Sequence, residues 1–252
     1  MDNSENMLKQ AELARLKETP RYKPETIWLD GVRIKIVDGY SFYCMYWEIF
    51  ERQIYRFKTT ADTPYIIDGG ANIGLSIRNF KDQYPKSRVL GFEPDERIFS
   101  VLKENIESWN YEDVELICRA LWSSETDMNF WSEGSDGGRL CSERDLDSQI
   151  VKTARLRDYL DSRIDFLKLD IEGAETDVLL DCADMLTNVA HLFVEYHSFV
   201  DKPQTLHKLI NIMADAGFRL HIHPQVISFH PFIQRDINNG MDLQLNIFGF
   251  RE

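Results

Sequence analysis

The sequence predicts an α/β fold, a mostly parallel sheet with helices on both faces. From residue 64 onward, short apolar segments alternate with helical segments of about ten or more residues. A glycine-rich turn directly follows the first apolar segment, as it does in nucleotide-binding sheets. The length of 252 residues and the hydrophobic content of 43% suit one α/β domain or two small ones.

The first 60 residues predict an appendage ahead of the sheet. Residues 5–18 are rich in helix formers, and Pro20 ends that helix. Two apolar alternations joined by Asp30-Gly31 then predict a β-hairpin. Over residues 40–57, apolar side chains recur every three or four positions and predict an amphipathic helix whose buried stripe is Tyr43, Trp47, Phe50, Ile54 and Phe57.

The second predicted domain, residues 61–252, contains the sheet. Its expected strands are 65–68, 88–92, 114–121, 164–169, 191–196, 218–224 and 243–250. Helices are expected over 74–84, 95–108, the segment after 170, and about 203–216. Segments 128–131 and 150–156 predict an additional strand pair around a glycine-rich loop. The last two strands follow one another without a helix, so one of them should be antiparallel.

The charge and the apolar pattern exclude several classes of protein. Asp and Glu number 42 against 29 Lys and Arg, and the net charge of −13 opposes a nucleic-acid partner. No apolar run is long enough for a membrane span, and the first residues lack a signal-peptide core. Four scattered cysteines fit a reducing compartment. We therefore expect a cytoplasmic protein; its oligomeric state is not predicted.

The segment D-G-G-A-N-I-G, residues 68–74, is the most informative. Its glycines do not have the G-x-G-x-x-G spacing of a dinucleotide site, and the Asp68 carboxylate would repel a diphosphate. S-adenosylmethionine carries a sulfonium and no phosphate, so the charge favours this cofactor over NAD. Glu93, about 20 residues further on, is placed to accept hydrogen bonds from ribose hydroxyls. Each feature also has a purely structural alternative. The glycine segment could be a plain tight turn, and Glu93 could be an acidic residue that favours a helix N-terminus.

Three motifs in order resemble the FkbM-type family of S-adenosylmethionine-dependent O-methyltransferases. They are Y-I-I-D-G-G-A-N-I-G (65–74), G-F-E-P (91–94) and I-D-F-L-K-L-D-I-E-G-A-E (164–175), and the similarity covers about residues 45–198. The segment R-L-R-D-Y-L (155–160) departs from the family's T-L-D-D-L element. The resemblance implies a class I methyltransferase (Rossmann-like) fold, with a seven-stranded sheet whose last strand is antiparallel.

The resemblance also implies roles for individual residues. Those assigned to the methionine half of the cofactor are Asp68, Gly70, Asn72 and Gly74. Glu93 is assigned to the ribose, and Ala120, within 119–121, to the border of the adenine. Asp170 and Glu172 are expected beside the transferred methyl group, with Asp170 also a cofactor contact.

Methyl transfer to a hydroxyl needs an aligned nucleophile and a group that takes its proton. We predict His197 as the general base, because its unperturbed pKa lies near 6.5, with Asp170 and Glu172 as further catalytic residues. Carboxylates and an imidazole at neighbouring strand ends also suit Mg²⁺ or Mn²⁺. The candidate ligands are Asp170, Glu195 and His197, although their spacing does not require a metal.

The acceptor site is predicted from two side chains. Arg139, in the loop Ser135-Asp136-Gly137-Gly138-Arg139, could contact an anionic group, and Tyr46 could stack on a sugar. We expect methylation of a small-molecule hydroxyl, and the resemblance implies a sugar of a glycan, glycolipid or natural product. The alternatives are an NAD-dependent oxidoreductase, a methyltransferase acting on RNA or protein, and a cofactor-binding scaffold without catalysis.

Overall fold

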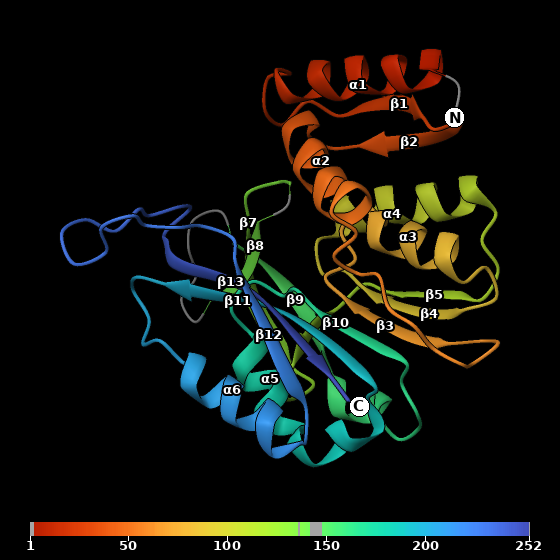
Figure 1. The fold of residues 1–252 in the computed structure, drawn as a ribbon. Helices are drawn as coiled ribbons and strands as arrows, with labels where there is room; N and C mark the ends of the chain where they lie inside the picture. Colours follow the sequence, from red (N-terminus) through yellow and green to blue (C-terminus); the bar gives the residue numbers. More distant parts are fainter. Residues whose placement is uncertain (1–2, 136, 142–147, 252) are drawn as a thin grey trace.

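A seven-stranded sheet forms the centre of the computed structural model, which describes residues 3–135, 137–141 and 148–251 (Figure 1). The strand order is β12-β13-β11-β10-β3-β4-β5. The bounds are β3 (Tyr65–Gly69), β4 (Arg88–Phe92), β5 (Val114–Ile117), β10 (Phe166–Leu169), β11 (His191–Phe199), β12 (Arg219–Pro224) and β13 (Met241–Phe250). Strand β13 is antiparallel to both of its neighbours, and the pairs among β11, β10, β3, β4 and β5 are parallel. The predicted fold class is confirmed.

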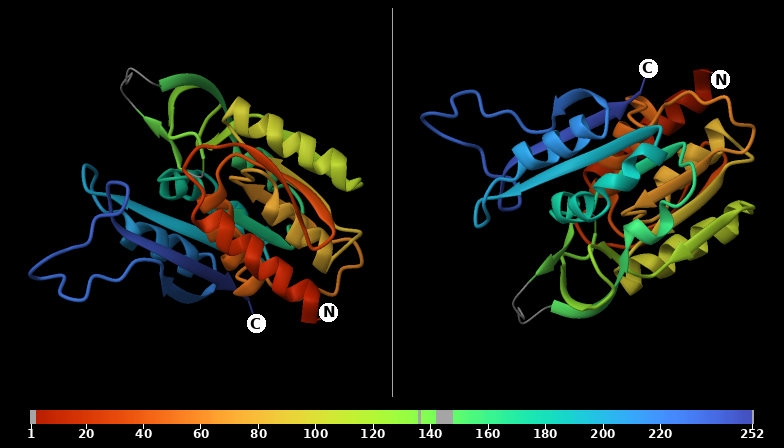
Figure 2. Two further views of the ribbon diagram at one scale, coloured as in Figure 1. Left: turned by 90° about the horizontal axis from the view of Figure 1, so that it is seen from above. Right: turned by 90° about the horizontal axis from the view of Figure 1, so that it is seen from below.

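Helices cover both faces of this sheet, which is why its strands are almost continuously apolar (Figure 2). Ile66 packs in the cluster that contains α3 (Leu75–Gln83) and α4 (Glu96–Trp109). Its neighbour Ile67 packs in the opposite cluster with α5 (Glu175–Asp181), η3 (Ala183–Asn188) and α6 (Leu206–Asp215). No helix within the described ranges is long and apolar enough to cross a lipid bilayer.

A second, four-stranded sheet is inserted between β5 and β10. Its order is β6-β9-β7-β8, with bounds Ala120–Trp122, Ser148–Arg155, Asp127–Ser132 and Gly138–Cys141, and the 3-10 helix η2 (Leu156–Tyr159) follows β9. The single strand expected over 114–121 is therefore wrong, because the chain leaves the main sheet after Ile117 and joins the second one at Ala120. Asp136 of the predicted loop lies outside the described residues.

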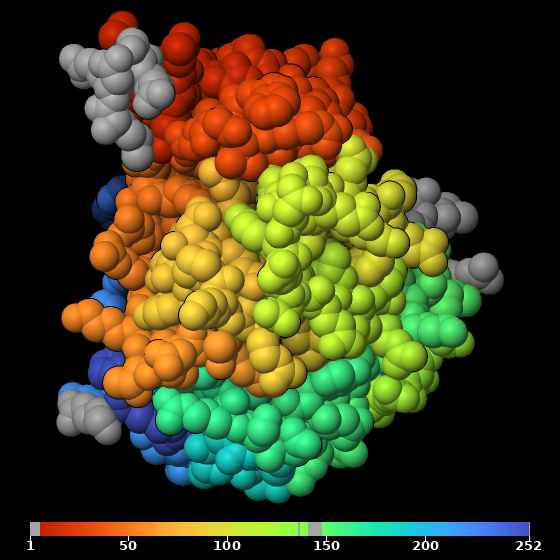
Figure 3. Space-filling model, turned by 90° about the vertical axis from the view of Figure 1, so that its right-hand side faces the viewer, coloured from red at the N-terminus to blue at the C-terminus, as the bar shows by residue number. Residues whose placement is uncertain are grey.

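The N-terminal unit is built as predicted from a helix, a hairpin and a second helix. Its elements are α1 (Asn3–Lys17), β1 (Glu25–Leu29), β2 (Val32–Ile36), α2 (Gly39–Tyr46) and the π-helix η1 (Trp47–Glu51). The unit packs directly against α4 (Figure 3). The buried Asn105 of α4 bonds to both the N–H and the C=O of Lys35 and to the Ile73 carbonyl. The unit and the sheet share one apolar core, and the boundary at residue 60 stays a prediction.

The aromatic helix differs from its prediction in length and in phase. It turns into the π-helix at Trp47 and ends at Glu51, short of residue 57. The most deeply buried apolar side chains of α2 and η1 are Phe42, Tyr46 and Ile49. Of the stripe that we expected, Phe57 is buried, Tyr43, Phe50 and Ile54 pack partly buried against the core, and Trp47 is 45% exposed. The aromatic residues of this segment fit two helical stripes one position apart, and packing on α1 and α3 selects the second.

Candidate active site

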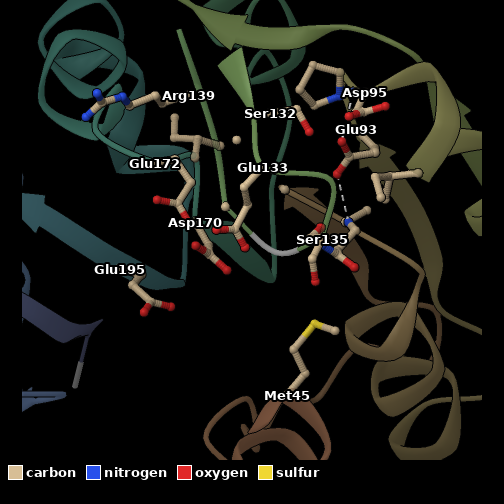
Figure 4. A pocket seen from close by; sticks show the side chains of 18 of the residues that line it. Met45, Glu93, Asp95, Ser132, Glu133, Ser135, Arg139, Asp170, Glu172 and Glu195 are labelled. Carbon is tan, nitrogen blue, oxygen red and sulfur yellow. Dashed lines mark hydrogen bonds between the residues drawn. The ribbon is translucent and has the colours of Figure 1, made fainter. Parts of the chain in front are cut away.

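A cavity of about 670 Å³ lies where the chain leaves the carboxyl ends of β3, β4 and β10. Its lining comes from the turns after these strands, from α2 and from the second sheet (Figure 4). This is the edge at which open α/β sheets bind their ligands, and the volume is that of a small-molecule site.

The floor of the cavity is the glycine turn after β3. The N–H groups of Gly70 and Ala71 both donate to the Phe92 carbonyl, at 3.0 and 2.8 Å, and so tie this turn to the end of β4. Gly70 has φ +80°, and a Cβ there would lie 1.9 Å from the Asp170 carbonyl oxygen. Only glycine fits this position, where the turns after β3 and β10 meet, and Gly70 also lines the cavity.

Glu93 lies at the opposite side of the turn. Its carboxylate accepts from the N–H of Asn72 at 3.0 Å and from the N–H of Asp95 at 2.9 Å. Burial raises the pKa of Glu93 to about 7, although these two backbone hydrogen bonds act in the other direction. The carboxyl lines the cavity, as a group that binds a ribose must.

Asp68 does not reach the cavity, which corrects the charge argument made from the sequence. Its side chain is fully buried under the turn, where it accepts from Ser76 and lies 3.2 Å from Lys168 Nζ. The Lys168 ammonium also donates to the carbonyls of Gly69 and Gly70, at 3.1 and 2.7 Å. Burial lowers the pKa of Lys168, but the carboxylates of Asp68 and Asp170 outweigh it and the net shift is upward.

The acidic rim of the cavity comes from other residues. Asp170, Glu172 and Glu195 line it and project toward one another in Figure 4. Glu195 is buried and accepts from Gln244 at 2.6 Å. Burial, and next the carboxylate of Asp170, raise the pKa of Glu195 well above its ordinary value. The negative charge expected at this site is present, but Asp170, Glu172 and Glu195 carry it instead of Asp68.

His197 lies behind these carboxylates and outside the cavity lining. Its Nδ1 is 2.9 Å from Glu175 Oε1, and its Nε2 is 3.7 Å from Glu172 Oε2, 4.0 Å from Asp170 Oδ1 and 3.9 Å from Glu195 Oε1. Burial alone would lower the pKa of His197, but the carboxylates of Glu172 and Glu175 raise it well above its usual value. The near-neutral pKa on which its choice as general base rested is therefore absent from this arrangement.

Four further predicted residues occupy different surroundings. Ala120 and Arg139 line the cavity, and the Arg139 guanidinium lies 4.5 Å from the centre of the Phe199 ring. Gly74 lies beneath the turn, where its φ of +97° begins α3 and a Cβ would press on Leu102. Tyr46 is buried in the core and its hydroxyl donates to Asp30, so the structure does not bring it to the acceptor. The helix phase is the cause: Tyr40, Cys44 and Glu48 of the same segment line the cavity instead.

Lys168 and Glu175 are the two residues that the sequence reasoning missed. Lys168 is a charge inside an otherwise apolar buried strand, and such a residue normally has a partner on the neighbouring strand. It is in register with Asp68 on β3. Glu175 ends the E-G-A-E motif, and its side chain accepts from the Gly173 N–H as well as contacting His197. Both signals were readable in the motifs themselves.

Comparison with known proteins identifies the family of this chain. A family model described as "Methyltransferase FkbM domain" matches residues 68–220, more than half of the chain. The chain belongs to the FkbM methyltransferase family. This FkbM protein is therefore a methyltransferase, and the oxidoreductase alternative is set aside.

Relatives and solved structures extend this comparison. "Methyltransferase 1" of Beauveria bassiana is 28% identical over 184 residues, 58% of this chain and 74% of the relative. "2-O-methyltransferase NoeI" of Sinorhizobium fredii is 28% identical over 169 residues, 58% of this chain and 68% of the relative.

A crystal structure of the FkbM methyltransferase from Methylobacillus flagellatus has a TM-score of 0.51 at 14% identity, over 97% of this chain. The chain spans about 60% of the length of that protein. The TYW2 structure from M. jannaschii in complex with AdoMet has a TM-score of 0.50 at 11% identity, over 92% of this chain and 87% of that protein. These two similarities bear on the fold.

Proposed function

We propose that this FkbM protein transfers the methyl group of S-adenosylmethionine to a hydroxyl of a small molecule, with a sugar as the acceptor class. The observation that carries the proposal is a single cavity with two chemically different ends. One end has the exposed Gly70 backbone, the Glu93 carboxyl and Ala120, and the other has Asp170, Glu172 and Glu195. The 2-O-methyltransferase named among its relatives supports oxygen as the atom that is methylated.

The cofactor is assigned to the first end. Ribose hydroxyls donate to Glu93, the adenine lies along Ala120, and the methionine part lies over Gly70 and Asn72 beside Asp170. Asp68 and Gly74 act indirectly in this arrangement. Lys168 and Asp68 hold the turn from below, and Gly74 begins the helix behind it. A diphosphate would be repelled by the carboxylates at the other end, whereas a sulfonium is attracted.

The acceptor is assigned to the second end. The acceptor oxygen attacks the methyl carbon, the new O–CH₃ bond forms as the S–CH₃ bond breaks, and the sulfonium becomes a neutral thioether. The hydroxyl proton passes to a carboxylate that faces the cavity, Asp170 or Glu172. His197 then acts through these carboxylates, as a positioning residue. Arg139, at the rim, contacts an anionic or polar group of the acceptor.

Ligand-dependent stabilisation tests the cofactor assignment. A ligand that binds the folded chain raises its melting temperature by mass action. We expect S-adenosylhomocysteine to raise the melting temperature of the full chain in a concentration-dependent way and NAD to leave it unchanged. Stabilisation by NAD alone would overturn the proposal.

Labelled cofactor tests the acceptor. Transfer of a labelled methyl group to free sugars, glycosides and oligosaccharides is expected, with RNA and protein as control acceptors. The net charge of −13 disfavours RNA. Labelling of RNA or protein with no transfer to any sugar would show that the acceptor is that macromolecule and not a sugar. Cofactor binding without transfer to any acceptor would favour the non-catalytic scaffold.

A further inference from the structure

The carboxylate end of the cavity has the geometry of a divalent-cation site. Asp170, Glu172 and His197 each offer one ligand atom, and these atoms all lie within 4.8 Å of one another. Glu195 lies beside this group, with its Oε1 3.9 Å from His197 Nε2 and accepting from Gln244. Oxygen and nitrogen ligands at roughly 2.0–2.6 Å from one ion are themselves roughly 3–5 Å apart, which is the spacing seen here.

The orientation of His197 is a second and independent observation. Its imidazole is 1% exposed and is held in one orientation by the carboxylate behind it. Nδ1 is held by Glu175, which is itself buried, and Nε2 therefore points at the three carboxylates. At 3.7–4.0 Å these oxygens are too far from Nε2 for hydrogen bonds. A carboxylate behind an imidazole whose other nitrogen faces oxygen ligands is the usual support of a metal-binding histidine.

The neighbouring charges fit a cation at this point. Asp170 divides its two oxygens, with Oδ2 3.4 Å from Lys168 Nζ and Oδ1 toward His197. Glu195 is held by Gln244 and Glu175 by the Gly173 N–H, so these side chains are fixed before any ion arrives. Two carboxylates and one imidazole, without a thiolate, are ligands for a hard ion such as Mn²⁺ or Mg²⁺.

We infer that Asp170, Glu172 and His197 bind one divalent cation, Mn²⁺ or Mg²⁺, with Glu175 as the positioning residue of His197. Binding of the ion does not depend on the proposed function, but its catalytic consequence does. When bound, the ion would lower the pKa of an acceptor hydroxyl, and a carboxylate that lines the cavity would take the proton as the O–CH₃ bond forms. The ion thus supplies the activation that a hydroxyl needs at neutral pH.

Direct binding of Mn²⁺ to the chelator-treated full chain tests this inference. The electron paramagnetic resonance signal of free Mn²⁺ disappears on binding, and we expect one equivalent to be taken up and displaced by excess Mg²⁺. Glu172→Gln, at a partly exposed position, should weaken binding at least tenfold. Glu175→Gln keeps the shape of the site and should weaken it by about 10- to 100-fold.

Glu48→Gln is the matched control, because Glu48 lines the same cavity but is held by Gln225 outside the ligand set. It should change Mn²⁺ affinity by less than about threefold, the scale of a screened charge nearby. Absence of saturable uptake, or wild-type affinity in Glu172→Gln, would overturn the inference. An equal loss in Glu48→Gln would also overturn it, since a diffuse acidic surface behaves that way.

A second measurement separates this inference from the proposed function. S-adenosylhomocysteine should stabilise the chain in EDTA, because its contacts lie at the other end of the cavity. Cofactor binding with no Mn²⁺ uptake would remove the cation and leave the methyltransfer proposal standing. Mn²⁺ uptake without cofactor binding would leave the cation site standing and remove the methyltransfer proposal. Full turnover in EDTA would remove the catalytic role of the ion.

Discussion

Gly70 shows how a single residue fixes the shape of the site. Its positive φ and its contact with the Asp170 carbonyl are two separate constraints, and the structure contains a position where only the first applies. Gly31, in the β1–β2 turn, has φ +73° and nothing within 4 Å of an added Cβ. A comparison of the two positions therefore separates backbone strain from the close approach of two turns.

We predict that Gly31→Ala lowers the free energy of unfolding by about 1–2 kcal/mol, the cost of a left-handed alanine. Gly70→Ala adds the collision with a backbone oxygen that cannot rotate away, and should cost at least about 3 kcal/mol and abolish S-adenosylhomocysteine binding. Urea denaturation and calorimetric titration measure the two effects. Equal losses of stability with unchanged binding would contradict the close contact.

Glu93 makes cofactor binding depend on pH. Ribose hydroxyls donate to the ionised carboxylate, so binding lowers the pKa of Glu93 from its value of about 7 in the free protein. About one molecule in eleven is ionised at pH 6 and about ten in eleven at pH 8, so the affinity for S-adenosylhomocysteine should rise about tenfold over this range. In the free protein the sign is opposite: a raised carboxyl pKa means that stability falls as pH rises from about 4.5 to 7.

Glu93→Gln tests this assignment. The amide cannot ionise, so calorimetry should show the affinity losing the part of its pH dependence that Glu93 supplies. Its affinity at pH 8 should also fall about tenfold, because hydrogen bonds to a charged acceptor are stronger. A variant with the wild-type slope between pH 6 and 8 would place the titrating group elsewhere.

At the scale of elements, α2 is where sequence and structure differ most usefully. Phe42 is fully buried, whereas Trp47 is largely exposed and stacks on Arg52. We predict that Phe42→Ala lowers the free energy of unfolding by about 3–5 kcal/mol and that Trp47→Ala lowers it by about 1 kcal/mol or less. Urea denaturation gives both values. A larger loss of stability in Trp47→Ala than in Phe42→Ala would instead support the buried stripe expected from the sequence.

The elements of the main sheet could be predicted because both of its faces are covered. Two-sided burial makes each strand a short apolar run, and the helices between them show on one face only. The change of sheet between β5 and β6 could not be predicted, because Val114–Trp122 is apolar enough throughout to continue as one strand. The π-helix was missed because a single turn of this kind is rare and is too short to show a periodicity of its own.

The site could be predicted to the level of motifs. The glycine turn, Glu93, Ala120 and the L-D-I-E-G segment do meet in one cavity. The directions of their side chains could not be predicted, because they depend on partners far along the chain. Asp68 points away from the cavity because Lys168, 100 residues later, lies beside it in the sheet. Tyr46 points away because Asp30 and Lys9 hold it in the core.

At the scale of the whole molecule, the net charge and the acidic cavity act in the same direction. S-adenosylmethionine carries one more positive charge than S-adenosylhomocysteine, and the carboxylates of Asp170, Glu172 and Glu195 face that charge under the proposed arrangement. We predict that the ratio of their affinities favours S-adenosylmethionine and falls about two- to threefold between 20 and 500 mM NaCl, roughly the range over which screening removes such an attraction. Calorimetric titration of both ligands at the two salt concentrations measures the ratio. A ratio that is independent of salt would argue against a sulfonium beside these carboxylates.

Lys168 lies in β10, near the middle of the main sheet, and its side chain is 3% exposed at the base of the cavity. Burial and the raised pKa, which favours the protonated amine, should make acylation of Lys168 slow while the fold is intact. Acetylation of Lys168, followed by mass spectrometry, therefore reports the rate at which the centre of the molecule opens. Exposed lysines such as Lys152, in the second sheet, should react at once, and their rate of acetylation is the internal reference.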